Sequence, residues 1–211
     1  MSTASVGRVD NVVVLSGELF DAIEVNAART GNHKRAAVRM SRLAVQATAG
    51  SMSRAEAHMR AGEQWLLADD PAAAATGFRL ALADGGPVFV DPRVPLARAL
   101  YLLGQSAEAQ ALLDQLKAEG RPDPRACDLV AELLVERSDL TGALDWATAG
   151  VELCLQRRPN GGPGAQGRSA DSSGEDDDAE AELRLLLSLR YRIRNDLGLP
   201  EDRYDELLDE A

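Results

Sequence analysis

Few side chains in the sequence are suited to act as nucleophiles, general bases or metal ligands. The only two histidines, His33 and His58, are 25 residues apart. Neither has Cys, His, Asp or Glu at the spacing of a metal site. Neither Cys127 nor Cys154 has a histidine close by in the sequence, and no serine lies in a Gly-x-Ser-x-Gly elbow. We therefore expect no catalytic residue, no metal and no cofactor, so the protein is not expected to be an enzyme.

The same four residues have simpler expected roles. His58 is expected to be a semi-exposed helical residue, and His33 a loop residue. The cysteines fall on apolar faces of predicted helices, where Cys behaves as a small hydrophobic side chain. We expect both to be buried.

Residues 158–180 are rich in Gly, Ser, Pro and Asp and almost free of large apolar residues. Their glycines, Gly161 to Gly167, lack the Lys of a phosphate-binding loop, and the acidic run Glu175–Asp178 lacks the spacing of a calcium loop. Such a segment cannot bury enough surface to offset the entropy lost on ordering. We expect a disordered acidic loop.

Composition favours helices and excludes several classes of function. Hydrophobic residues make up 45% of the 211 residues but aromatic ones only 4%, so the core must consist mainly of Ala, Leu and Val. Ala and Leu are strong helix formers. The net charge of −11 disfavours binding to nucleic acids and to anionic membranes. No apolar run is long enough to span a membrane, and no secretory signal precedes the first elements, so we expect a cytoplasmic protein.

One pattern of small and large residues recurs along the middle of the chain at spacings of 35 and 34 residues. Each copy predicts two helices, A and B, joined by a turn at Asp69-Asp70-Pro71, at Gly104 or at Ser138-Asp139. The small residues let the two helices approach, and the larger ones fill the groove between them. The positions are Gly62, Trp65, Ala74, Phe78 and Ala81; Ala97, Leu100, Ala109, Leu113 and Leu116; and Ala131, Leu134, Ala143, Ala147 and Gly150.

This pattern resembles the tetratricopeptide repeat (TPR), whose period is about 34 residues. The resemblance covers Ser53–Leu155, about half of the chain. It implies an all-α fold, a TPR-like α-solenoid of about three helix-turn-helix repeats in residues 52–157. Neighbouring pairs must stack, because a single pair cannot bury its apolar face.

Residues 181–211 are predicted to form a C-terminal capping helix followed by an acidic tail. The Leu-rich helix should span Glu182–Leu197, because Gly198 can end it and Pro200 prevents its continuation. The residues after it, Glu201–Ala211, are expected to form a short acidic helix or a frayed tail. This end of the chain is also similar to the C-terminal tails of uncharacterised bacterial TPR proteins, although it lacks the Cys/His metal-binding motif that some of them carry.

Residues 1–51 have the least regular pattern, and we interpret them as a poorly defined N-terminal extension. A short strand at Val12–Leu15 and helices at Glu18–Ala28 and His33–Ala47 are expected within it. Because Met52 stands just before the first repeat, one hypothesis is that translation begins there and that residues 1–51 are a mis-assigned extension.

The resemblance also implies a binding site, because helices A of TPR arrays line a concave groove that receives a peptide. The residues of this sequence at the groove positions are mostly acidic or aliphatic, with one cation, so we expect a protein or peptide partner that is basic or amphipathic. The nine positions are Met59, Glu63, Leu66, Val94, Arg98, Tyr101, Asp128, Glu132 and Val135.

We therefore expect a non-catalytic protein-binding module or scaffold. Two alternatives stay open: a regulatory subunit of a co-encoded enzyme or transcription factor, and a structural protein that self-associates, for example as a homodimer.

Overall fold

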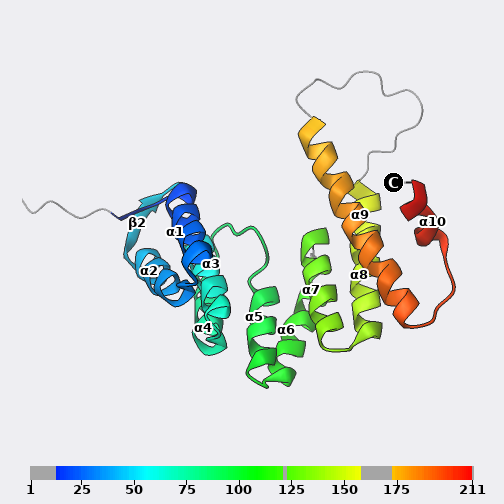
Figure 1. Cartoon of the computed structure of the whole chain (residues 1–211), viewed down its shortest axis with the longest axis horizontal. Helices are drawn as coiled ribbons and strands as arrows, with labels where there is room; N and C mark the ends of the chain where they lie inside the picture. The colour runs from blue at the N-terminus through cyan, green and yellow to red at the C-terminus, as the bar shows by residue number, and fades with distance from the viewer. Residues whose placement is uncertain (1–12, 121–122, 158–172, 211) are drawn as a thin grey trace, which may run out of the picture. The chain divides into compact units, whose positions relative to one another are not determined.

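The computed structural model describes residues 13–120, 123–157 and 173–210. Two short strands and ten helices follow one another in these ranges (Figure 1). Contacts between Cα atoms divide the chain into two compact units, Met1–Ala109 and Gln110–Ala211, with the boundary inside a helix. Each unit contains a cluster of buried apolar side chains of its own.

The first unit begins with a strand, two helices and a second strand. The strand and both helices were predicted to within two residues, whereas the second strand was not predicted. The strands pair in parallel, and Leu15 lies opposite Gly50, where a Cβ atom would stand 2.3 Å from the Leu15 carbonyl oxygen. The elements are β1 (Val13–Leu15), α1 (Gly17–Thr30), α2 (His33–Gln46) and β2 (Ala47–Gly50).

These first elements share an apolar core with the next helix, α3 (Arg54–Leu67). Phe20 of α1 and Met40 of α2 are fully buried in the same cluster as Ala57 and Ala61 of α3. Residues 13–50, interpreted above as part of a poorly defined extension, thus form regular, packed structure, while residues 1–12 lie outside the described ranges. A start of translation at Met52 remains a hypothesis, and it would leave this side of α3 without its packing partners.

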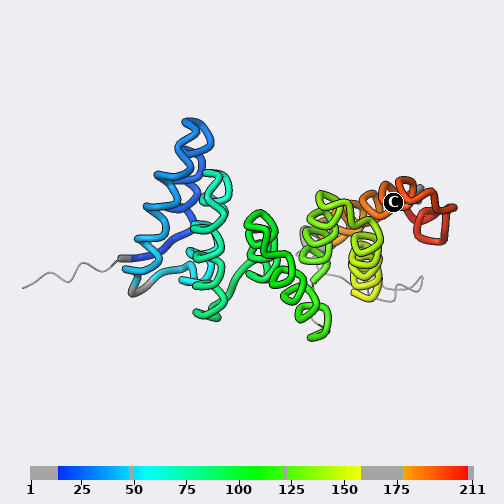
Figure 2. The backbone as a smooth tube through the Cα atoms, turned by 90° about the horizontal axis from the view of Figure 1, so that it is seen from below, coloured from blue at the N-terminus to red at the C-terminus, as the bar shows by residue number. Residues whose placement is uncertain are grey.

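Two more helices, α4 (Pro71–Asp84) and α5 (Arg93–Leu102), continue the unit. Helix α3 packs between α2 and α4, and α4 packs against α5 (Figure 2). The contact between α3 and α4 depends on Gly62, where a Cβ atom would lie 2.4 Å from Cε1 of the fully buried Phe78 ring. The packing roles predicted for these two residues are therefore confirmed.

In the second unit, helices that follow one another in sequence again pack together. Helix α7 packs on α8, and α9 packs on both of them and on α10. Helix α9 begins at Ser173, inside the range 158–180 predicted to be disordered, and residues 158–172 of that range lie outside the described residues. The helices are α6 (Ser106–Ala118), which crosses the boundary, α7 (Pro124–Glu136), α8 (Leu140–Arg157), α9 (Ser173–Asp196) and α10 (Arg203–Glu210).

The three predicted repeats end their first helix in the same way. The residues at the turns, Asp69, Gly104 and Ser138, all have left-handed backbone angles, with φ between 57° and 75°, at spacings of 35 and 34 residues. In each turn the next amide donates to a carbonyl five residues back, for example from Asp70 to Trp65 at 3.0 Å. This bond satisfies one of the carbonyls left open at a helix end. The repeat is thus present in the backbone as well as in the residue types.

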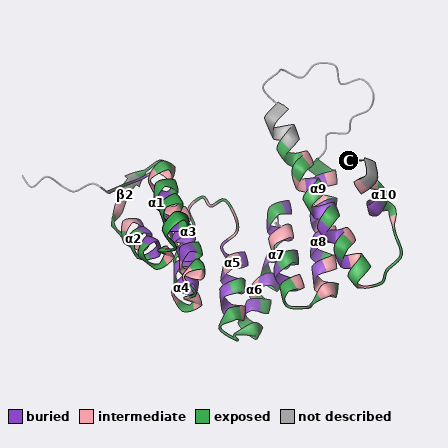
Figure 3. Ribbon diagram, viewed as in Figure 1, coloured by how far each residue is buried: buried purple, intermediate pink, exposed green. Residues whose placement is uncertain are grey.

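The repeat positions are also buried as predicted (Figure 3). All the small and large residues of the three copies are buried except Trp65, which is half-buried. Its indole N–H donates to the Ser41 hydroxyl of α2 at 3.3 Å. Sequential helix pairs with a common seam are therefore established, in line with a helical-repeat arrangement.

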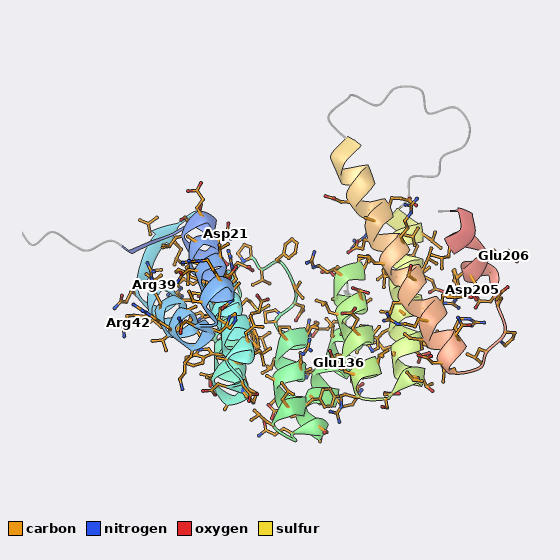
Figure 4. The ribbon with its side chains drawn as sticks, viewed as in Figure 1. Asp21, Arg39, Arg42, Glu136, Asp205 and Glu206 are labelled. Carbon is orange, nitrogen blue, oxygen red and sulfur yellow. The ribbon has the colours of Figure 1, made fainter. Side chains whose placement is uncertain are left out.

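Four charged side chains, two of them buried and two half-buried, join the end of the chain to α9. Arg190, with 3% of its surface exposed, donates to Asp202 at 2.9 Å and to Asp205 at 3.2 Å. Arg194 donates from Nε to Asp205 at 3.1 Å and pairs with Asp202 at 2.9 Å. The guanidinium of Arg190 also lies 4.6 Å from the centre of the Tyr204 ring. Charge pairing as well as apolar packing thus holds α10 on α9, and Asp205 lies on α10 (Figure 4).

We expect Gly62→Ala to lower the free energy of unfolding by about 1–3 kcal/mol, because the buried Phe78 ring cannot move away from the added methyl group. Chemical denaturation followed by circular dichroism measures the loss. Gly17→Ala is the matched control, since nothing lies within 4 Å of a Cβ atom at that position. Equal effects of the two substitutions would contradict a close contact between α3 and α4 at Gly62.

We expect Arg190→Met to destabilise the second unit by about 1–3 kcal/mol at pH 7, because Asp202 and Asp205 lose their most buried cation and keep only Arg194 as an ion-pair partner. The pKa of Asp202 is lowered, chiefly by its hydrogen bond to Arg190. Its contribution to stability is therefore present above the ordinary pKa of Asp and is lost in acid, so the difference from the wild type should shrink below about pH 4. Thermal unfolding at both pH values checks this, and Arg192→Met, at an exposed position of the same helix, should have little effect.

Candidate binding surfaces

The predicted groove positions keep the same register in all three helices A. Glu63, Arg98 and Glu132, on α3, α5 and α7, are exposed. Leu66, Tyr101 and Val135, three residues further along each helix, are half-buried. Positions three apart are neighbours on a helix surface. Each helix A therefore presents a charged residue beside an apolar one.

The third set of predicted positions is less accessible. Met59 and Val94 are buried, with 3% and 4% of their surfaces exposed, so their side chains belong to the core. The equivalent residue on α7, Asp128, is half-buried. The first six of the nine positions lie in the first unit and the last three in the second.

Carboxylates gather where α7 and α9 pack together in the second unit. The pKa of Asp128 is raised, first by burial and then by repulsion from Glu132 and Glu182. Arg125 and Arg192 oppose this shift but do not reverse it. The pKa of Glu182, on α9, is also raised by burial. Glu182 was not among the predicted site residues, because nothing in the sequence brings α9 beside α7.

A pocket between α1 and α2 was missed entirely. It has a volume of about 270 Å³ and lies within the first unit. Its buried or half-buried lining is apolar, with Leu19, Ile23, Ala27 and Ala36, whereas its exposed lining includes Asn26, Asn32, Arg35 and Arg39. The signal in the sequence was the run of cations in residues 33–47 without a single acidic residue.

The histidines do not lie where they were expected. His58 is buried rather than semi-exposed, with 8% of its surface exposed, and burial lowers its pKa. His33 is the first residue of α2 rather than a loop residue, and its Nδ1 lies 3.0 Å from the Gln64 side-chain oxygen. Each therefore has a structural role within the first unit.

The cysteines lie where they were predicted. Both are buried, Cys127 on α7 and Cys154 on α8. Burial raises the pKa of the Cys127 thiol to about 12, so the thiolate needed for nucleophilic attack does not form near neutral pH.

The described ranges contain no group of three His, Cys, Asp or Glu side chains that could hold a metal ion. In the same part of the chain, every helix is too short or too polar to cross a bilayer. The chain has no significant match among protein-family models, curated proteins or solved structures. The case for a function therefore depends on the surfaces described above.

We expect Asp128→Asn to raise the free energy of unfolding at pH 7 by up to about 1 kcal/mol. The folded state binds a proton at Asp128 more tightly than the unfolded chain does, so ionisation of this group costs stability as the pH rises. The gain should vanish near pH 3, where the carboxyl is protonated in both states. Denaturation at the two pH values measures it. Asp145→Asn, at an exposed position of α8, is the control, and destabilisation by Asp128→Asn at pH 7 would contradict the assignment.

Proposed function

We propose that this protein is a non-catalytic module of the TPR kind that binds an amphipathic segment of a partner protein on its helices A. The observation that carries the proposal is the shared register of exposure. One equivalent position on each of α3, α5 and α7 is exposed, and the position three residues further along each helix is half-buried.

The assignment to TPR-like repeats is supported by the turns and the seam. Left-handed residues at Asp69, Gly104 and Ser138 recur at spacings of 35 and 34 residues, close to the TPR period. The small residues that a TPR seam requires are buried at each copy.

The chemistry of the two rows indicates what kind of segment would bind. Leu66, Tyr101 and Val135 offer partly open apolar surface, which a partner would bury with its own apolar side chains. The adjacent row carries two carboxylates and one guanidinium. An amphipathic helix laid into a groove has the matching pattern of apolar anchors and flanking charges.

The carboxylates where α7 and α9 pack together favour a cation on a segment that binds there. Asp128 experiences repulsion from Glu132 and Glu182 in addition to burial. A Lys or Arg of the partner would relieve this repulsion and lower the pKa of Asp128 again. A basic or amphipathic partner is thus the better match, whereas an acidic one would add to the repulsion.

Site-specific photo-crosslinking tests this function in the native host. A benzophenone amino acid in place of Tyr101 should crosslink to the partner, because position 101 lies on the proposed face. The same group in place of Leu102 is the control, since the next residue of a helix points about 100° away and Leu102 is 64% exposed. Mass spectrometry identifies the crosslinked segment, which should be amphipathic.

Charge reversal provides the second arm of the test. We expect Glu63→Lys, on α3 of the same unit, to reduce the yield of the crosslink at position 101 at least several-fold, and Asp145→Lys on α8 to leave it unchanged. Equal crosslinking from positions 101 and 102, or no effect of Glu63→Lys, would refute binding on helices A. A crosslinked dimer of the chain would instead favour self-association.

A further inference from the structure

Helix α2 carries its charges against the usual rules of helix stability. Its first turn contains His33, Lys34 and Arg35 and no acidic residue, although the N-terminus of a helix is the positive end of its dipole. Arg35 and Arg39 are four residues apart, where like charges repel across one turn. Violations of local rules without a gain in packing are expected at functional sites.

The acidic side chains of α1 do not neutralise these cations. Asp21 and Glu24 bond instead to Arg60 of α3, which donates to them at 2.6 and 2.8 Å. Arg60 also lies over the Phe20 ring, 5.6 Å from its centre. Asp21 and Glu24 are therefore already paired with a cation of α3 and do not pair with the cations of α2.

The cations of α2 are left exposed, and none of them has an ion-pair partner within the described ranges. These cations are Lys34, Arg35, Arg39 and Arg42. In Figure 4, Arg39 and Arg42 extend outward from α2. The same face exposes Val38 by 42% and Val45 by 69%, so it combines positive charge with apolar surface.

Two of the cations border the pocket between α1 and α2, whose inner lining includes Leu19 and Ile23. Asn32 also lines the pocket, and its side chain makes no hydrogen bond that caps its own helix. A volume of about 270 Å³ exceeds the roughly 150 Å³ of an apolar cavity that accepts benzene. An aliphatic side chain therefore fits inside while polar groups reach Arg35 and Arg39.

The structure points to a second binding site here: we propose that α1 and α2 bind an acidic amphipathic helix of a partner protein. A leucine of that helix enters the pocket, and two carboxylates pair with Arg35 and Arg39. Residues four apart on a helix are about 6 Å apart along its axis. Glutamates four apart on the partner therefore have the same spacing along a helix as Arg35 and Arg39 have on α2.

The chemistry favours a protein over a nucleic acid as the occupant. The four cations lie on one helix of a chain whose net charge is −11, which repels a phosphate backbone at longer range. Phe20, the only Phe, Tyr or Trp of α1 and α2, is fully buried, so these helices offer no aromatic surface for stacking bases. An apolar pocket next to the cations suits an aliphatic side chain.

The test measures binding of a fluorescein-labelled helical peptide, about 16 residues long so that it holds a helix, by fluorescence anisotropy. The peptide carries Glu-Ala-Ala-Leu-Glu, and its controls replace both glutamates by Gln or the leucine by Ser. We expect the full-length protein to bind the acidic peptide, more weakly as salt is added. Each control peptide should bind at least about tenfold more weakly, which corresponds to about 1.4 kcal/mol.

Matched variants locate the site. Arg35→Gln with Arg39→Gln should weaken binding at least about tenfold, whereas Lys34→Gln with Arg42→Gln removes the same charge from α2 and should weaken it less than about threefold. Ala22→Phe introduces a bulky side chain at an exposed residue that lines the pocket and should weaken binding without a change in charge. Circular dichroism confirms that each variant is folded.

Four outcomes would overturn the proposal. They are an equal loss with either pair of substitutions, no effect of Ala22→Phe, tighter binding of a DNA duplex than of the peptide, and self-association that Arg35→Gln with Arg39→Gln abolishes. The last would make a second copy of the chain the occupant. Because α1 and α2 form this site alone, its result is independent of binding on helices A.

Discussion

The close approach of antiparallel helices controls most other features of this chain. At Gly62 the backbone of α3 comes so near to the Phe78 ring of α4 that no side chain larger than hydrogen fits. In the second unit, Gly150 of α8 has the same role against Leu186 of α9 and Cys127 of α7. Helices this close bury the faces that carry the small residues, and the turn geometry fixes which positions remain outside. The exposed rows of helices A are a consequence of that contact.

Charge is distributed unevenly over these helices, so that one surface is positive and another is negative. Residues 33–46 carry four cations and no carboxylate, whereas Asp128, Glu132 and Glu182 gather at α7 and α9. The buried pairing of Arg190 with Asp202 and Asp205 serves another purpose, since these groups are satisfied within the protein and unavailable to a ligand. Exposed charges without partners favour recognition and fast association more than stability.

The two proposals together describe an adaptor with binding surfaces of opposite preference. Helices A would accept a basic or amphipathic segment, and the pocket of α1 and α2 an acidic one. Opposite preferences lower the chance that one partner competes for both surfaces, because like charges across an interface are unfavourable. A partner at each surface would be brought together without any chemistry by the protein itself.

The sequence by itself determined the helices, their turns and the seam between them. These features depend on neighbours along the chain: Asp70 caps α4 before Pro71, Gly104 supplies a left-handed turn, and Gly62 and Phe78 repeat a known spacing. The burial of both cysteines followed from the same periodicity.

Only the tertiary structure decided which of these residues lie inside and which distant groups meet. Met59 and Val94 had the periodicity of groove residues, yet both are buried. The pairing of β1 with β2 and the approach of Glu182 to Asp128 join segments that are far apart in sequence, and the pocket depends on how α1 packs against α2. Local patterns specify a helix and its apolar face, but contacts between distant segments depend on how the helices pack, and no pattern within one helix contains that information.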